Sequence, residues 1–360
     1  MRQSLSSPLL LSTLFLASGG AVATPEVTVS GLLELELSSS EGFDPAPLGG
    51  APSYDRDNRS DLRFATAFMK IGSQVNDSTY AEISLLYEED YTPLEIDAAM
   101  VVLGNSEVSP WSLQFGQIYL PSGNFTTNMI DYTLPQDLLE IREAGLQLNY
   151  ADSSGLYGSA YLFAGEVEKR GNNANTNGFG AQLGWRQEHD AGSIDVGVSL
   201  LNNLANGRWI KIKGLDSASG GGTLQETGIN DEVAAYALHA NAQWGDWGVA
   251  SEYASASSAF HADDIAFNGH GAQPAAWNIE GSYQFVAATR PMVLAVGLQG
   301  SREAYAIGLP EQELLINLTL ALVEGTSLRL EYNRYEDYAV TDGGSGEQAS
   351  RVIARISTEF

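Results

Sequence analysis

The sequence contains no cysteine and few basic residues. Without cysteine, disulfides, thiolate metal sites and a lipoprotein anchor are excluded. Lysine and arginine together number 18 against 45 acidic residues, which gives a formal net charge of −27. So acidic a chain lacks the basic surface that recognition of nucleic-acid phosphates needs, and nucleic acid is therefore excluded as a partner.

Long apolar runs are also missing. After the N-terminal region the longest run, Leu314 to Val323, is interrupted by Asn317 and Thr319, whereas a membrane helix needs about 20 apolar residues. Charged residues make up only 18% of the chain, below the roughly 25% that is usual in soluble domains. Any membrane span must therefore consist of strands, which hide their backbone polar groups only by closing into a barrel.

The first residues predict an export signal. Arg2 precedes a mostly apolar stretch from Pro8 to Ala17, and Ala21-Val22-Ala23 has the small-x-small pattern of a cleavage site. The stretch is too short to cross a bilayer as a helix. The sequence thus predicts a signal peptide over residues 1–23 and a single further domain over residues 24–360.

The feature that is present throughout is alternation of apolar and polar residues with a period of two. About sixteen such segments occur, each near the length of a tilted barrel strand, and long connections alternate with short ones. This pattern predicts an all-β fold: a transmembrane antiparallel β-barrel of about sixteen strands without a plug domain. Its place would be the outer membrane of a Gram-negative bacterium, in contact with outer-membrane lipid.

The last ten residues, 351–360, form one of these segments and end on Phe360. A half-buried strand of a soluble sheet is the alternative reading of this tail alone. The tail resembles the closing strand of bacterial outer-membrane barrels, in which a terminal phenylalanine is the assembly signal. The resemblance implies the barrel-assembly machinery as a partner. Trimers are common among sixteen-stranded porins, so a homotrimer is a further assembly to test.

One face of the predicted strands carries charged residues that we expect to line a water-filled lumen. Both signs occur with acids in excess, which favours cations and can orient a dipolar solute. The alternative is that these charges only solvate the wall. The residues are Glu34, Glu36, Arg63, Glu82, Glu95, Asp97, Arg186, Arg329, Glu331, Arg351 and Arg355.

The sequence gives no support for catalysis, a cofactor or a metal centre, so we predict that the protein is not an enzyme. Its four histidines fall in different elements, and neither Gly-x-Ser-x-Gly nor His-Glu-x-x-His occurs. His261 with Asp263 and Asp264 could hold a metal ion, but a solvated acidic loop is the simpler interpretation because nothing fixes the geometry.

The connection between the fifth and sixth predicted strands carries the most distinctive motif. It reads Phe115-Gly-Gln-Ile-Tyr-Leu-Pro-Ser-Gly-Asn-Phe125 and continues to Glu140-Ile-Arg-Glu143. The segment resembles the LbtU-type siderophore porin family, which has Phe-Gly-Gln-x-Tyr-x-Pro-Phe-Gly-x-Phe and a later Glu-x-Arg-Glu; Ser122 departs from the family's phenylalanine. The resemblance implies a porin that passes iron–siderophore complexes without energy coupling.

The same connection is the third external one, which in sixteen-stranded porins commonly folds inward and narrows the channel. A loop that only caps the barrel from outside is the alternative. Phe125, Met129, Ile130 and Leu134 are expected to pack an inward loop against the wall. The residues predicted for a constriction and solute path are Gln117, Tyr119, Pro121, Gly123, Phe125, Arg142 and Glu143.

Three functions remain open at this point. The first is passive or selective uptake of ferric siderophores through a porin. The second is a general or cation-preferring porin for small polar solutes. The third is a structural or adhesive barrel whose external connections 202–231 and 255–275 bind a partner.

Overall fold

A computed structural model describes residues 26–42, 59–89, 92–171, 176–213, 224 and 228–360. The predicted signal peptide, residues 1–23, lies outside these ranges, as does most of the first external connection. Among the described residues, no helix is long and apolar enough to cross a membrane.

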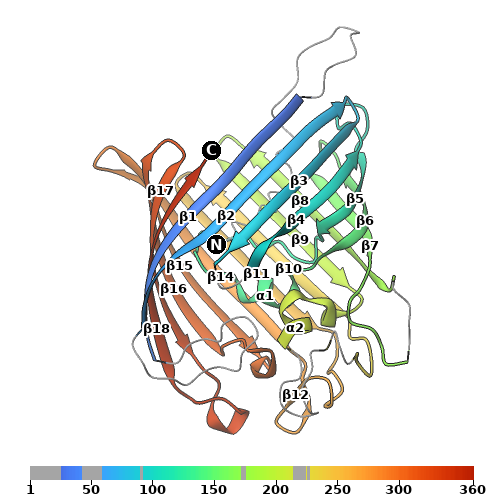
Figure 1. The fold of residues 1–360 in the computed structure, drawn as a ribbon, viewed down its shortest axis with the longest axis vertical. Helices are drawn as coiled ribbons and strands as arrows, with labels where there is room; N and C mark the ends of the chain where they lie inside the picture. The colour runs from blue at the N-terminus through green and yellow to red at the C-terminus, as the bar shows by residue number, and fades with distance from the viewer. Residues whose placement is uncertain (1–25, 43–58, 90–91, 172–175, 214–223, 225–227) are drawn as a thin grey trace.

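Sixteen antiparallel strands close into one barrel, which confirms the predicted fold class (Figure 1). Strands that follow one another in the chain pair in the sheet, and β1 pairs with β18 to close it. A short ribbon, β12 (Ala266–Phe267) with β13 (His270–Gly271), lies in the connection from β11 to β14. The barrel strands are β1 (Glu26–Glu41), β2 (Arg59–Asn76), β3 (Thr79–Glu88), β4 (Thr92–Leu103), β5 (Trp111–Tyr119), β6 (Arg142–Ala151), β7 (Leu156–Phe163), β8 (Gly178–His189), β9 (Gly192–Leu201), β10 (Ala235–Trp244), β11 (Trp247–Ala256), β14 (Ala275–Ala287), β15 (Arg290–Arg302), β16 (Gln312–Val323), β17 (Thr326–Glu336) and β18 (Gln348–Glu359).

Alternation along each strand gives the barrel an apolar outer face and a polar inner face. In β1, Leu33, Leu35 and Leu37 are 43%, 48% and 53% exposed, whereas Glu34 and Glu36 between them are 2% and 0% exposed. Exposed apolar side chains continue around the barrel and form the belt that contacts lipid. They include Leu146, Leu148, Leu183, Leu238, Ile279, Leu298, Leu330 and Val352.

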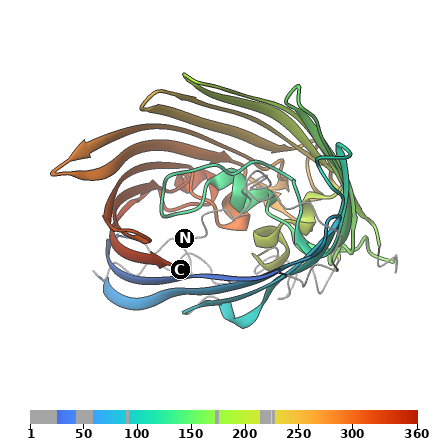
Figure 2. The same cartoon turned by 90° about the horizontal axis from the view of Figure 1, so that it is seen from above.

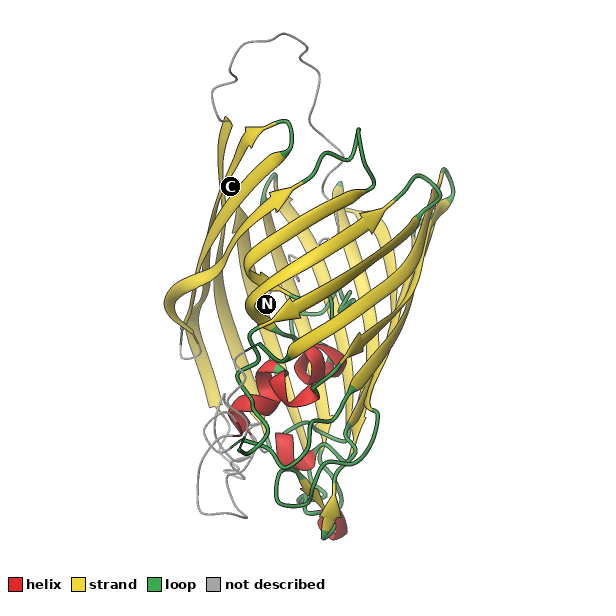
Figure 3. Ribbon diagram, turned by 90° about the vertical axis from the view of Figure 1, so that its right-hand side faces the viewer, coloured by secondary structure: helices red, strands yellow, loops and turns green. Residues whose placement is uncertain are grey.

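The two ends of the barrel differ in their connections. One end has short turns, such as the two residues Gly245-Asp246 between β10 and β11. The other end carries the long connections, which hold the helices of the barrel (Figure 3). These are the α-helices α1 (Leu134–Leu139) and α2 (Arg208–Lys213) and the short 3₁₀ helices η1 (Leu204–Asn206), η2 (Tyr305–Ile307) and η3 (Val340–Asp342). Long connections lie on the external side of outer-membrane barrels, so this is the external end.

Phe360 takes part in closing the sheet. Its backbone exchanges two hydrogen bonds with Gly31 of β1, at 2.9 and 3.1 Å, just beyond the last residue of β18. Its ring also fills the space above Gly31, because a Cβ atom at that glycine would lie 2.5 Å from the ring. The bare backbone of Gly31 therefore lets the aromatic end of the chain pack against the first strand.

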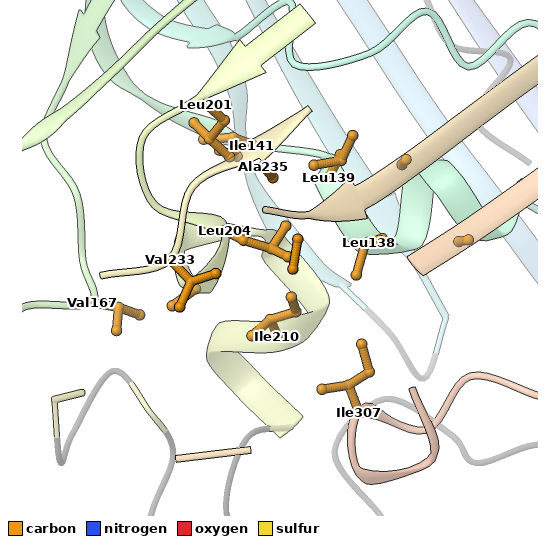
Figure 4. Close-up of a cluster of buried hydrophobic side chains, with 14 of the residues drawn as sticks. Leu138, Leu139, Ile141, Val167, Leu201, Leu204, Ile210, Val233, Ala235 and Ile307 are labelled. Atoms are coloured by element: carbon orange, nitrogen blue, oxygen red, sulfur yellow. The ribbon is translucent and has the colours of Figure 1, made fainter. Parts of the chain in front are cut away.

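The largest apolar core is made mainly by the external connections. Buried side chains from the connections β5–β6, β7–β8, β9–β10, β11–β14 and β15–β16 pack together and against side chains of β5, β7, β9, β10, β11 and β14. Figure 4 shows Leu204, Ile210 and Val233 gathered near Leu138 and Leu139. These connections are therefore packed structures, which the sequence pattern had identified only as loops.

Candidate functional site

Residues 120–141, the inward loop, run from β5 to β6 inside the barrel and carry α1 into the ring of strands (Figure 2). A carboxylate on the opposite wall holds the start of this loop. Glu252 of β11, 4% exposed, accepts hydrogen bonds from the backbone N–H groups of Asn124 and Phe125, both at 2.8 Å. Hydrogen bonds to an ionised acceptor are about twice as strong as neutral ones, so this contact fixes the loop's entry into the lumen.

Two more wall carboxylates hold the middle of the loop. Glu280 of β14 accepts a hydrogen bond from the N–H of Asn128 at 2.9 Å. Glu331 of β17 accepts hydrogen bonds from the N–H groups of Ile130 and, at 3.1 Å, Asp131. Together Glu252, Glu280 and Glu331, the wall carboxylates, hold successive stretches of loop backbone across the barrel. The position of the loop is therefore set by hydrogen bonds from its backbone N–H groups to carboxylates of the wall.

Side chains add to these contacts at the β15–β18 wall. Arg329, 7% exposed, donates to the carbonyl of Asn128 at 2.6 Å. Asp131 of the loop accepts hydrogen bonds from Tyr335 at 2.7 Å and Asn333 at 2.5 Å. Its carboxylate also lies 3.5 Å from Arg351. The loop thus crosses from β5 to the far wall and is held at both sides.

The motif residues shape the loop's first turn. A Cβ atom on Gly123 would lie 2.2 Å from the ring of Phe125 and 2.7 Å from a carboxylate oxygen of Glu252, closer than real contacts allow. Phe125 itself has a positive φ of 54° and is 6% exposed. Glycine is therefore needed here for close approach. Pro121 lies just before this turn.

Ser122, which departs from the family pattern, has its own role. Its hydroxyl donates to the carbonyl of Leu139 at 2.6 Å, and the residue is 2% exposed. This bond joins the start of the loop to the end of α1. Thr133 caps that helix by accepting from the N–H of Gln136 at 3.2 Å, and Leu134, Leu138 and Leu139 are buried. Met129 and Ile130, which we expected to pack the loop, are also buried.

Four arginines gather on the wall formed by β17, β18, β1 and β2. At one height of the barrel, Arg329 lies opposite Arg355, Arg355 opposite Glu36, and Glu36 opposite Arg63. Glu36 is fully buried among them, 2.7 Å from Arg63 and 2.9 Å from Arg351. Arg63, Arg329, Arg351 and Arg355 form what we call the arginine row, and Arg63 and Arg351 keep 13% and 20% of their side chains exposed.

The predicted lumen charges therefore lie in two environments. Glu34, Glu36, Arg329, Glu331 and Arg355 are all less than 9% exposed and contact one another or the inward loop. Others are partly exposed: Glu82 lies 3.7 Å from Lys70, and Arg186 pairs with Asp195 at 2.5 Å. The charges of the buried group are therefore neither exposed to water on the wall nor free to face the lumen, because they contact one another or the inward loop.

Gln117, Tyr119 and Arg142 lie where two strands separate. β4 pairs with β5 only from Ala99 to Leu103, while β5 continues with β6 as far as Tyr119 and Arg142. Side chains bridge the remaining part. Gln117 donates to the carbonyl of Ile96 at 3.1 Å, Tyr119 donates to Asp97 at 2.6 Å, and Arg142 pairs with Asp97 and Glu95 at 3.0 and 2.6 Å. Where the main-chain ladder stops, Gln117 and Tyr119 thus join β4 to β5, and Arg142 joins β4 to β6.

Glu143 contacts a different connection. Its carboxylate lies 2.5 Å from Lys211 of α2, and Lys211 also lies 2.7 Å from Glu166. Arg208 of the same helix reaches Glu140 at 3.4 Å. Glu143 thus ties the β9–β10 connection to the wall next to the inward loop.

Besides the arginine row, two arrangements were not predicted from the sequence. Tyr157, Asp195 and His239 meet inside the barrel: the tyrosine hydroxyl lies 2.7 Å from Asp195 and 3.1 Å from His239. The second is the set of wall carboxylates. Their inward direction follows from strand alternation, but their common task depends on a loop distant in the sequence. Among the described residues, no group of three or more histidine and acidic side chains is arranged to hold a metal.

No protein-family model matches the sequence. The chain is 22% identical over 354 residues to the UPF0422 protein lpg2959 of Legionella pneumophila, covering 90% of this chain and 66% of that protein. It is 22% identical over 341 residues to a UPF0422 protein of Coxiella burnetii, with 92% and 69% covered. The chain thus spans just under two thirds of the Legionella relative.

Solved structures with the same architecture are outer-membrane channels. The channel DcaP of Acinetobacter baumannii has a TM-score of 0.63 at 14% identity, and the match covers 96% of this chain and 100% of that chain. An anion-selective porin from Comamonas acidovorans has a TM-score of 0.60 at 12% identity, with 94% and 100% covered. Salmonella typhi OmpF in complex with daunomycin has a TM-score of 0.59 at 13% identity, with 93% and 97% covered. The chain therefore has a porin-like sixteen-stranded fold and, with its apolar outer belt, is a protein of the Gram-negative outer membrane.

Proposed function

We propose that this protein is a diffusion porin in which the inward loop narrows the channel and selects the solute. The observation that carries the proposal is the attachment of loop backbone to Glu252, Glu280 and Glu331 across the barrel. A loop held in this way narrows the lumen permanently. A barrel of sixteen strands is otherwise wide enough for an aqueous channel.

Charge at the narrowed section supports electrostatic selection. Arg63 and Arg351 of the arginine row are partly exposed, and Asp131 of the loop pairs with Arg351 at 3.5 Å. The exposed parts of these two arginines give one side of the channel a positive charge, which acts on charged solutes that pass it. Steric and electrostatic selection then needs no chemical step.

For the solute, we propose ferric siderophores on the strength of the motif from Phe115 to Phe125. Gly123 and Phe125 form the turn against Glu252, and Ser122 replaces the family's phenylalanine while binding Leu139. The motif thus builds the loop that the solute would pass. We further propose export by the signal peptide over 1–23 and assembly through Phe360.

Single-channel current in a planar bilayer tests both levels of this proposal. Ferric siderophores are titrated into one chamber, with their iron-free forms as the matched control. Saturable, reversible blockade by one ferric form alone would support the siderophore assignment. Steady conductance without blockade would remove that assignment and leave a general porin.

A general, cation-preferring porin is the second candidate, favoured by the net charge of −27. The reversal potential in a salt gradient separates it from the first candidate. A general porin should show a fixed cation preference that siderophores do not alter. Absence of any conductance from correctly folded protein would contradict both candidates and favour a structural or adhesive barrel.

A further inference from the structure

His239 of β10 lies at the centre of a buried polar cluster inside the barrel. Its side chain is 1% exposed, and its ring fills the space above Gly197 of β9, where a Cβ atom would lie 2.5 Å from the ring. The Nε2 atom lies 3.1 Å from the hydroxyl oxygen of Tyr157 and 3.4 Å from a carboxylate oxygen of Asp195. The channel wall thus contains a titratable group that the proposed function does not use.

The hydrogen bonds of the cluster fix where the ring carries its proton. Tyr157 donates its single hydroxyl proton to Asp195 at 2.7 Å, because an ionised carboxylate can only accept. The tyrosine oxygen can therefore only accept from His239, so Nε2 carries the proton of the neutral ring. A second proton would add at Nδ1 and make the ring a cation.

Charged groups approach the ring from both neighbouring strands and beyond. Arg186 of β8 pairs with Asp195 of β9 at 2.5 Å, so these two charges offset each other. Glu252 of β11 lies directly opposite His239 in the register of β10 and β11. Side chains opposite one another on adjacent antiparallel strands have Cβ atoms about 4.5–5.5 Å apart. The carboxylate that holds the start of the inward loop is therefore a close neighbour of the histidine ring.

The remaining elements around the ring contribute uncharged groups. β7 contributes the hydroxyl of Tyr157, and β14 presents the amide of Asn278 opposite Glu252. The loop stretch 123–127 consists of glycine, asparagine, phenylalanine and threonine. With a neutral ring the cluster thus has one net negative charge, and protonation of the ring brings this charge to zero.

We propose that His239 is a positioning residue of the constriction, and that its protonation strengthens the hold of Glu252 on the inward loop. The inference rests on the proposed function, in which this loop narrows the channel. Glu252 accepts hydrogen bonds from the N–H groups of Asn124 and Phe125 when the loop is docked, and in this state it is 4% exposed. Opposite charges attract more strongly where water is excluded, so a protonated ring favours the docked loop.

The effect has a defined direction with pH. Histidine ordinarily titrates between about pH 5 and pH 8, so the additional hold is present at the acidic end and is lost as the pH rises. Burial of the cationic ring offsets part of its attraction to Glu252. We expect the ratio of docked to released loop to be about tenfold higher at about pH 5.5 than at about pH 8.

Single-channel recording over this pH range tests the proposal. The wild-type current should become quieter as the pH falls, with about tenfold less time in the released state at the acidic end. His239→Gln keeps an amide donor for Tyr157 and cannot gain a charge, so its current noise should stay constant. His261→Gln is the matched control and should follow wild type, because His261 lies in an external connection with its side chain 50% exposed.

Asp195→Asn provides a second test, because it removes the negative charge that lies nearest the ring. The midpoint of the pH profile should move to lower pH, since the cationic ring loses a stabilising neighbour and Arg186 loses its partner. A wild-type current that does not change with pH, a wild-type profile in His239→Gln, or an unshifted midpoint in Asp195→Asn would each overturn the inference. Should His239→Gln fail to fold, the wild-type profile and Asp195→Asn still decide.

The variant Glu252→Ala separates this inference from the proposed function. If this variant conducts like wild type, the wall carboxylates do not hold the loop and the proposed function fails. If it is noisier than wild type while His239→Gln keeps the wild-type pH profile, the proposed function stands and only the role of His239 is refuted.

Discussion

Replacing Glu252 by alanine should release the start of the inward loop. The side chain accepts two backbone hydrogen bonds at 2.8 Å, from Asn124 and Phe125, in a buried setting. Hydrogen bonds to charged groups contribute about 1.5–3 kcal/mol each, so the gross loss is about 3–6 kcal/mol. Water entering the vacated space recovers part of this. At the lower figure of about 3 kcal/mol, the ratio of docked to released loop falls roughly a hundredfold.

Single-channel recording measures this change directly. The variant should show higher mean conductance and added current noise, since residues 123–126 would leave the wall while Glu280 and Glu331 still hold residues 127–131. Glu82→Ala is the control, because Glu82 accepts from Tyr80 at 2.7 Å and does not contact the loop. Heat-modified mobility on gels establishes that both barrels are folded.

A crosslink provides the reverse experiment. The chain has no cysteine, and Asn241 of β10 donates to Asn124 at 2.7 Å. Cysteines at both positions in the Glu252→Ala background should form a disulfide under oxidation and restore the wild-type current, and reduction should remove the effect. If the Glu252→Ala variant has the conductance and current noise of wild type, the wall carboxylates do not fix the loop. The same conclusion follows if formation of the disulfide leaves the current of the variant unchanged.

Three further predictions concern other parts of the barrel. Gly123→Ala should shift Phe125 by overpacking, at about 1–3 kcal/mol, and alter conductance more than the same change at the exposed turn residue Gly245. Arg142→Ala removes the ion pairs that bridge β4 to β6 and should lower the temperature of heat modification, whereas an unchanged temperature would show that the bridge is dispensable. Arg351→Ala removes a charge that acts on a passing ion with about 0.7 kcal/mol at ~6 Å in water, and the reversal potential should move toward cations by a factor of about three in permeability ratio.

Much of the barrel could be predicted because strand alternation is local. Glu34 between Leu33 and Leu35 already shows which side of β1 faces lipid, since successive side chains point to opposite faces. Chain order then gives the pairing, because each strand pairs with its neighbour and β18 returns to β1. The alternation cannot show which inward charges share one height. The arginine row around Glu36 depends on register between four strands, including two at opposite ends of the chain.

The motif shows the same limit. The sequence marked Gln117, Tyr119 and Arg142 together with Gly123 and Phe125 as one constriction set. The structure divides them: the first three join β4 to β5 or β6, and the last two turn the loop against Glu252. Whether these roles govern solute passage stays a prediction.

By itself, then, the sequence determined the barrel, its strand number and its lipid-facing side, since period-two alternation and the absence of membrane helices act within single segments. The tertiary structure decided where the inward loop lies. That position depends on Glu252, Glu280 and Glu331, which lie 127 or more residues beyond the backbone N–H groups from which they accept hydrogen bonds. Contacts of this kind leave no local pattern in the sequence. A glutamate that accepts hydrogen bonds from a loop and a glutamate that is solvated on the wall both appear as an acidic residue at an inward-facing strand position.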